Sequence, residues 1–135
     1  MADLYGSTYQ KVSLGYFMEQ SDTPCGLDVS LEIMGGKWKP LILYHVQDGP
    51  TRFSEVRRLI GGISEKVLAQ QLRDLVAVGV LERRDHHRVP PVVDYSLTPF
   101  GRTLVEALIP LCEWGNRNRA HVAKLSQNAS KMKIE

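Results

Sequence analysis

The chain has few of the features that mark secreted, membrane-bound or disulfide-stabilised proteins. Only two of its 135 residues are cysteines, Cys25 and Cys112, and no stretch approaches the roughly 20 apolar residues that span a bilayer. The N-terminus lacks the basic start and apolar run of a signal peptide. We therefore expect a cytoplasmic protein with no membrane partner, in which both cysteines are thiols rather than a structural disulfide.

Sequence signatures of enzymes are missing as well. The chain has no Gly-rich phosphate loop, no Cys/His metal spacing, no nucleophile elbow and no carboxylate pair whose spacing suits acid/base chemistry. His86 and His87 are adjacent, and neighbouring residues of a strand point to opposite faces, so they form a poor pair of metal ligands. We expect neither catalysis, nor a metal, nor a cofactor.

Composition is that of one ordinary globular domain, and the distribution of charge is more informative. Hydrophobic residues make up 43% and charged residues 24% of the chain, and the net charge is only +2. Between Lys37 and Arg88, however, ten Lys or Arg face six Asp or Glu. A positive surplus confined to one region favours contact with phosphate groups.

The segment from Gly61 to Gly79 has the pattern of a capped amphipathic helix. Ser64 can accept from free backbone N–H groups, so it is the predicted N-cap of a helix that begins at Glu65. The buried side of this helix is predicted to carry Leu68, Leu72, Leu75 and Val76, and the outer side Lys66, Gln70 and Arg73. Gly79 ends the helix.

A charged hairpin follows. Val80 to His87 is typical of a strand that runs into a basic loop, and Val92 to Leu97 has the alternation of a returning strand. A short helix from Ser54, the turn, the capped helix and this hairpin occur in the order of a winged helix-turn-helix, whose second helix enters the major groove of double-stranded DNA. The predicted DNA contacts are Arg52, Arg57, Ser64, Lys66, Gln70, Arg73, Arg84, His87 and Arg88.

Two other interpretations of these elements remain open. An amphipathic helix with a polar outer face is often only a solvated surface helix, although the basic hairpin and the preceding helix favour DNA binding. A winged helix can also bind another protein, but the cations on both helix and hairpin would then need a separate explanation.

The rest of the chain flanks this core. Residues 1–24 are expected to form an arm, partly disordered or packed on a partner. A helix from Cys25 to Met34 precedes a second one that starts near Lys37 or Trp38 and turns Leu41, Ile42 and Val46 inward. After a short strand at Thr51 to Phe53 comes the helix from Ser54, with Val56, Leu59 and Ile60 on its apolar side.

Thr98 and Pro99 mark the start of a C-terminal helix. This helix is expected to kink or break near Pro110 and to reach about Leu125, which leaves residues 126–135 as a loose tail. The predicted domain is thus 25–125. Its fold is mainly α with a small antiparallel β wing. The flanking N- and C-terminal helices carry more apolar residues than a small winged core can cover. This excess predicts a twofold homodimer on a near-palindromic operator.

The residues CGLDVSLEIMGGKWKPLIL, RFSEVRRLIGGISEKVLAQQLRDL, VPPVVDYSLTPFGRTL and LCEWG closely resemble the HxlR-type regulators, a MarR-related winged-helix group. The resemblance covers roughly residues 25–115. It implies a homodimeric DNA-binding transcription regulator whose dimers form through the N- and C-terminal helices. We expect a repressor, although no residue distinguishes repression from activation.

The resemblance also implies a role for Cys25. Some family members use a cysteine at this position to sense quinones, aldehydes or oxidants, but here Gly26 replaces the proline that usually follows it. A reactive thiolate and a merely tolerated small residue both remain open for Cys25. Cys112 is expected to pack in the core or an interface, with pairing to Cys25 of the other subunit as the alternative.

The wing departs from the family pattern. This chain has His86 and Arg88 where relatives commonly carry tyrosine and an acidic residue, so we predict that Arg88 contacts phosphate.

Trp38 and Trp114 are expected to be packing residues, although a dimer-interface cleft that they line could admit an aromatic effector. A reversible small-molecule ligand is therefore the alternative to modification of Cys25 by an electrophile.

Overall fold

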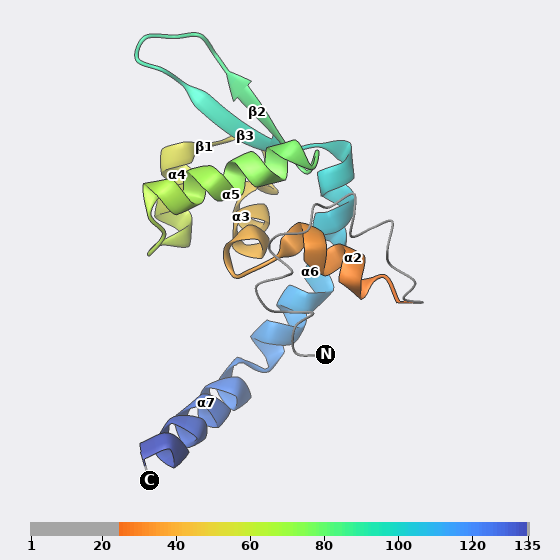
Figure 1. Ribbon diagram of the computed structural model, residues 1–135, viewed down its shortest axis with the longest axis vertical. Coiled ribbons are helices and arrows are strands. Elements are labelled where there is room, and N and C mark those ends of the chain that lie inside the picture. The colour runs from red at the N-terminus through yellow and green to blue at the C-terminus, as the bar shows by residue number, and fades with distance from the viewer. Residues whose placement is uncertain (1–24, 135) are drawn as a thin grey trace.

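A computed structural model describes residues 25–134 of the chain, with side chains as far as Met132 (Figure 1). Helices alternate with the strands of a small sheet, and two longer helices follow at the C-terminal end. In order these are α2 (Leu27–Met34), α3 (Trp38–Val46), β1 (Thr51–Arg52), α4 (Phe53–Ile60), α5 (Glu65–Ala77), β2 (Leu81–Asp85), β3 (Val93–Leu97), α6 (Pro99–Arg117) and α7 (Arg119–Ile134). The arm expected at residues 1–24 lies outside the described residues.

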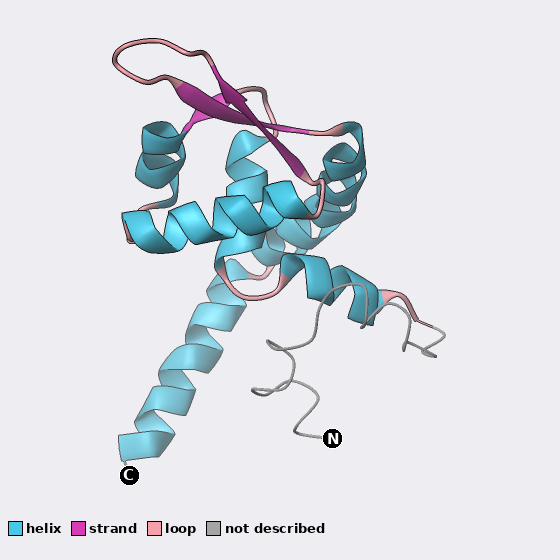
Figure 2. Cartoon of the chain, turned by 45° about the horizontal axis from the view of Figure 1, so that its top comes forward, coloured by secondary structure: helices cyan, strands magenta, loops and turns pink. Residues whose placement is uncertain are grey.

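The core lies where α3, α4 and α5 meet the sheet (Figure 2). Its fully buried side chains include Ile42, Leu43, Val46, Val56, Leu68, Leu72 and Leu75. The inward stripe expected for α5 is confirmed for its three leucines. In α3 the expectation for Leu41 was wrong: this residue is 39% exposed, and Leu43 is buried instead. The helix is covered on the side of Leu43, whereas the side of Leu41 borders an open groove beside α6.

The sheet is antiparallel and has the order β1-β3-β2, with β3 in the middle. Pairing of Leu81 with Leu97 and of Asp85 with Val93 fixes the register of the hairpin, and Thr51 of β1 pairs with Tyr95. The expected wing is therefore present. Its strand β2 buries only Leu81 and exposes the four residues that follow.

Helix α6 is anchored at its first turn. Thr98 Oγ1 accepts from the Gly101 N–H at 2.9 Å, and Pro99 occupies the first helical position. Of the kink or break expected near Pro110, the break does not occur, and α6 continues to Arg117. The position is exposed, so water can satisfy the carbonyl that the missing proline N–H leaves free.

The C-terminal end is also more regular than expected. Residues 126–134, predicted to be a loose tail, belong to α7. No glycine or proline follows Gly115, and polarity alone does not stop a helix. Helix α7 projects away from the rest of the chain, at the end opposite the wing (Figure 1). Within the described part of the chain, no helix is long and apolar enough to cross a membrane.

Candidate nucleic-acid interface

Helix α5 presents a polar row to the solvent. The Val67 N–H donates to Ser64 Oγ at 3.1 Å, which confirms Ser64 as the N-cap. Lys66, Gln70 and Arg73 recur at steps of four and three, and all three are exposed on the side opposite the buried leucines. The helix therefore carries donors and acceptors suited to base edges along one accessible face.

Hydrogen bonds order the second half of this row. Arg73 donates to Gln70 Oε1 at 3.0 Å, and Gln70 donates through Nε2 to Asp74 at 2.8 Å. Asp74 in turn pairs with Lys39 of α3 at 3.7 Å. Because both ends of the Gln70 amide are held, its orientation is set before any ligand arrives.

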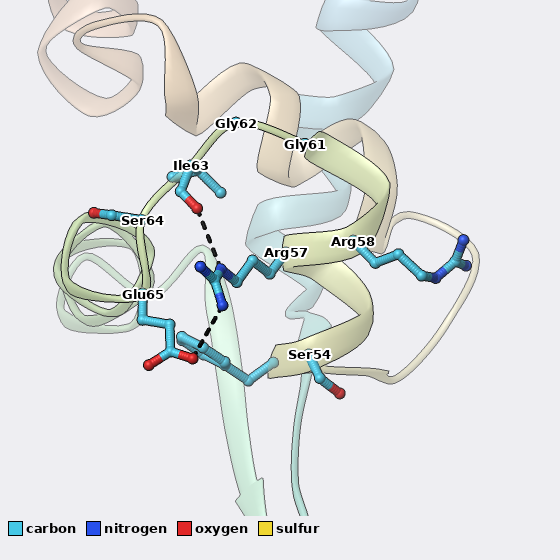
Figure 3. A pocket seen from close by; sticks show the side chains of 9 residues that line it. Ser54, Arg57, Arg58, Gly61, Gly62, Ile63, Ser64 and Glu65 are labelled. Carbon is cyan, nitrogen blue, oxygen red and sulfur yellow. Dashed lines mark hydrogen bonds and ion pairs between the residues drawn. The ribbon is translucent and has the colours of Figure 1, made fainter.

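The turn between α4 and α5 is braced by one arginine. Arg57 donates to the Ile63 carbonyl at 3.3 Å and to Glu65 at 3.0 Å. Its side chain lies between α4 and the start of α5, beside an open hollow of about 690 Å³, whereas Arg58 points away from Glu65 (Figure 3). Arg58 pairs with Glu55, and this hydrogen bond lowers the pKa of the Glu55 carboxyl and raises that of the arginine.

The wing carries its own polar contacts. His86 Nε2 lies 2.6 Å from Asp94 Oδ2, which joins the residue that follows β2 to the second residue of β3. The His87 N–H donates to Asp85 at 2.8 Å, and this bond is the main reason why the pKa of Asp85 is lowered. His87 takes a positive φ of 51°, and Arg88 beside it is exposed. The loop thus holds the guanidinium of Arg88 exposed at its tip.

The elements that carry most of the predicted contact residues lie at one end of the chain. Helix α5 and the β2–β3 hairpin are both at the end away from α7 (Figure 1). Arg52 lies at the N-cap of α4, in register with Asp94 of β3. The guanidinium of Arg57 is bonded across the turn between α4 and α5, to the Ile63 carbonyl and to Glu65.

Sequence reasoning left three polar residues of this side out of the contact set. Arg83 is exposed on β2, Lys39 contacts Asp74, and His86 contacts Asp94. Strand alternation puts Arg83 on the opposite face from the predicted contact Arg84, so the local pattern does not indicate both. The two ion pairs depend on tertiary packing and on strand register, which the local pattern does not contain.

The two cysteines are free thiols, and both are exposed. Cys25 immediately precedes Gly26, the N-cap residue of α2. Cys112 lies on α6 and accepts a long contact of 3.8 Å from the Asn116 amide. It is not in the core of the single chain, and it lines a groove of about 610 Å³ between α3 and α6.

Nowhere in 25–134 do three or more His, Cys, Asp or Glu side chains gather as a metal site would require. Trp38 packs against the core, whereas Trp114 is 53% exposed and is not a core residue of the single chain.

Comparisons with known proteins agree with this arrangement. The model of the family described as HxlR-like helix-turn-helix matches residues 33–123. YybR of Bacillus subtilis, described as an HTH-type transcriptional regulator, is 46% identical over 95 residues, which are 70% of this chain and 76% of that protein.

The solved structures of the redox regulator HypR are similar as well. Its reduced form gives a TM-score of 0.70 at 43% identity and covers 74% of this chain and 99% of that one. Its oxidised form gives a TM-score of 0.66 at 46% identity, with 70% and 97% covered. The family consists of DNA-binding regulators and not of enzymes. The chain belongs to the HxlR-like helix-turn-helix family of transcriptional regulators.

Proposed function

We propose that the chain acts in the cytoplasm as a homodimeric repressor that binds a near-palindromic operator and responds to modification of Cys25. The observation that carries the DNA-binding part is the outer row of α5, Lys66, Gln70 and Arg73, next to a hairpin that exposes Arg84 and Arg88. A helix in the major groove with a wing on the adjacent backbone uses these two surfaces together.

The homodimer is supported by apolar side chains that the single chain leaves uncovered. Helix α2 buries none of its residues, and Leu27 is 65% exposed. On α6, Leu111 is 63% exposed. Apolar surface of this kind on both flanking helices is typical of a subunit interface. A twofold dimer would place two copies of α5 about 34 Å apart, or a multiple of that, on the operator.

A thiol switch at Cys25 is supported by its place. The thiol is exposed and adjoins α2, one of the two helices with uncovered apolar surface. Its modification at an interface would change the packing of α2 and hence the spacing of the two α5 helices. Two of the similar structures are of a redox regulator in reduced and oxidised forms.

Reversible binding of a small molecule is the second candidate. The groove between α3 and α6 is lined mainly by apolar side chains, among them Leu41, Tyr44, Leu108 and Ile109. Its volume of about 610 Å³ is within the usual size of ligand sites. An aromatic effector in this groove would act by the same change in spacing.

A mobility shift on the upstream intergenic DNA of the gene tests both candidates. The wild type and Cys25→Ser are compared when reduced and after diamide, which takes two electrons and two protons from two thiols as a disulfide forms. Loss of binding by the treated wild type alone would establish the thiol switch. Loss of binding by both proteins would exclude Cys25 and leave Cys112 for the same test.

Two other results would contradict parts of this proposal. Unchanged DNA binding by both treated proteins would exclude the thiol switch and favour an effector in the groove between α3 and α6. Aromatic compounds would then be tested for their ability to release the protein from the duplex. If no duplex, including those from a genome-wide selection, shows salt-dependent binding, the DNA-binding proposal fails and a protein-binding winged helix replaces it.

A further inference from the structure

Helix α7 is a surface without a partner in the described chain. Every α7 side chain from Arg119 to Met132 is exposed, including Val122 at 42%, Leu125 at 52% and Met132 at 77%. An isolated helix of 16 residues is only marginally stable in water, and most helical stability comes from packing of an apolar face. The three apolar side chains therefore indicate that something covers this helix.

Charge indicates what kind of partner this is. Residues 116–135 carry five Lys or Arg and a single acidic residue, Glu135. Lys124 and Lys131 are seven residues apart, which puts them on one side of α7, and Arg119 lies on its first turn. A partner that complements α7 combines apolar side chains with acidic ones.

The N-terminal segment of the chain has this composition. Residues 1–24 carry three acidic side chains and only one lysine, Lys11. Among them are Glu19 and Asp22, shortly before α2, and the same segment contains Tyr5, Tyr9, Tyr16 and Phe17. Aromatic side chains supply large apolar area for their number, so the segment can cover the apolar side chains of α7.

We propose that residues 1–24 of a second copy of the chain cover α7 and hold it by opposite charge. This inference rests on the proposed homodimer. Helix α7 continues away from its own core at the end of α6 (Figure 1), so an α6 that packs on a second copy carries α7 toward that copy. A segment of 24 residues spans up to about 80 Å when extended, and α7 is only about 24 Å long.

Two other occupants fit less well. Operator DNA bound by α5 and the wing lies at the opposite end of the chain from α7 (Figure 1). A lipid surface selects helices with one broad apolar face, whereas α7 offers three large apolar side chains along its described length.

Charge reversal in two separate proteins provides the test. The arm variant carries Glu19→Lys and Asp22→Lys, and the helix variant carries Lys124→Glu and Lys131→Glu. Hydrogen–deuterium exchange of the α7 backbone amides is measured by mass spectrometry in the absence of DNA. In each variant we expect exchange about tenfold faster than in the wild type, because like charges on the arm and on α7 then repel and uncover the helix. A variant with Asp48→Lys and Glu82→Lys changes the net charge as the arm variant does but leaves both segments intact, and its α7 is expected to exchange like the wild type.

Mixing the arm and helix variants identifies the occupant. In a mixed dimer the reversed arm meets the reversed helix and the unchanged arm meets the unchanged helix, so protection of α7 is expected to return. If protection returns only when all four substitutions are in one chain, each arm covers its own α7 and the proposal is wrong.

The remaining outcomes separate this inference from the homodimer. A wild type that sediments as a dimer while α7 exchanges equally fast in all variants would overturn the inference and leave the dimer intact. A wild type that sediments as a monomer would overturn both. If the α7 amides are protected only after duplex DNA or anionic lipid vesicles are added, that ligand covers α7 and the second copy of the chain does not.

Discussion

Arg57, near the end of α4, bonds to Glu65, the first residue of α5, and so fastens the two helices of the helix-turn-helix to each other. The distance from Nη1 to Oε1 is 3.0 Å, and the same guanidinium donates to the Ile63 carbonyl at 3.3 Å. From the sequence, Arg57 was predicted to contact DNA. The structure gives it a bracing contact in the chain itself, and its contact with DNA stays a prediction.

Replacement of Arg57 by alanine is expected to lower the free energy of unfolding by about 1 kcal/mol, because the charged hydrogen bonds across the turn are lost at a partly exposed site. Arg58→Ala is the matched control. Arg58 pairs with Glu55 within one exposed helix, and its loss should cost no more than about 0.5 kcal/mol. Urea unfolding of both variants measures the difference. Equal midpoints combined with weaker DNA binding by Arg57→Ala would assign this residue to DNA alone.

Gln70 is the side chain of α5 whose amide is fixed at both ends, by Arg73 and by Asp74. Gln70→Ala is therefore expected to reduce discrimination between the operator and an unrelated duplex by about 1 to 3 kcal/mol, the contribution of one good base contact. Competition titrations at fixed salt measure the ratio. Arg88→Ala on the wing provides the contrast, because loss of a phosphate contact weakens both duplexes alike. A Gln70 variant with unchanged discrimination would place base recognition elsewhere on α5.

Arg88 lies at the exposed tip of the wing, next to His87 with its positive φ. Arg88→Ala is expected to weaken binding to every duplex and to reduce the slope of log affinity against log salt by about 1, the effect of one phosphate contact. Arg117→Ala removes one cation at the C-terminal end of α6, away from the wing, and should leave the slope unchanged. If both variants gave the wild-type slope, the assignment of Arg88 to phosphate would be wrong.

Local patterns predicted the helix-turn-helix well because each signal acts within a few residues. Ser64 caps the turn that follows it, and the leucine spacing from Leu68 to Leu75 gives one buried stripe. The outward direction of Lys66, Gln70 and Arg73 follows from the same periodicity. The bonds of Gln70 to Arg73 and Asp74 fall at helical steps of three and four as well. The pair of Asp74 with Lys39 does not follow from the periodicity, because it forms only when α3 packs on α5.

The incorrect expectations share a physical reason. Leu41 and Leu43 are both apolar, and which of them is buried depends on the elements that cover α3. Of the kink or break expected near Pro110, the break does not occur, because an exposed carbonyl can bond to water instead of the missing N–H. The polar C-terminus forms a helix because no residue in it stops one. Each outcome depends on surroundings that a short window of sequence does not contain.

Two glycines of α6 provide the final prediction. A side chain at Gly101 would overlap the backbone carbonyl of Val80, where the start of α6 packs against the segment between α5 and β2. A side chain at Gly115 meets nothing within 4 Å. Gly101→Ala is therefore expected to destabilise the fold by about 1 to 3 kcal/mol through overpacking. Gly115→Ala is expected to stabilise it by roughly 0.5 to 1 kcal/mol, because alanine loses less backbone entropy in a helix.

Thermal and urea unfolding of both glycine variants check these opposite signs. Because Gly101 lies where α6 meets the residue just before the wing, its substitution should also weaken operator binding, while Gly115→Ala should not if the position is free in the assembled protein. A Gly115→Ala variant that is less stable only as a dimer would show instead that a second copy approaches the backbone of α6 there, since the single chain leaves that position open.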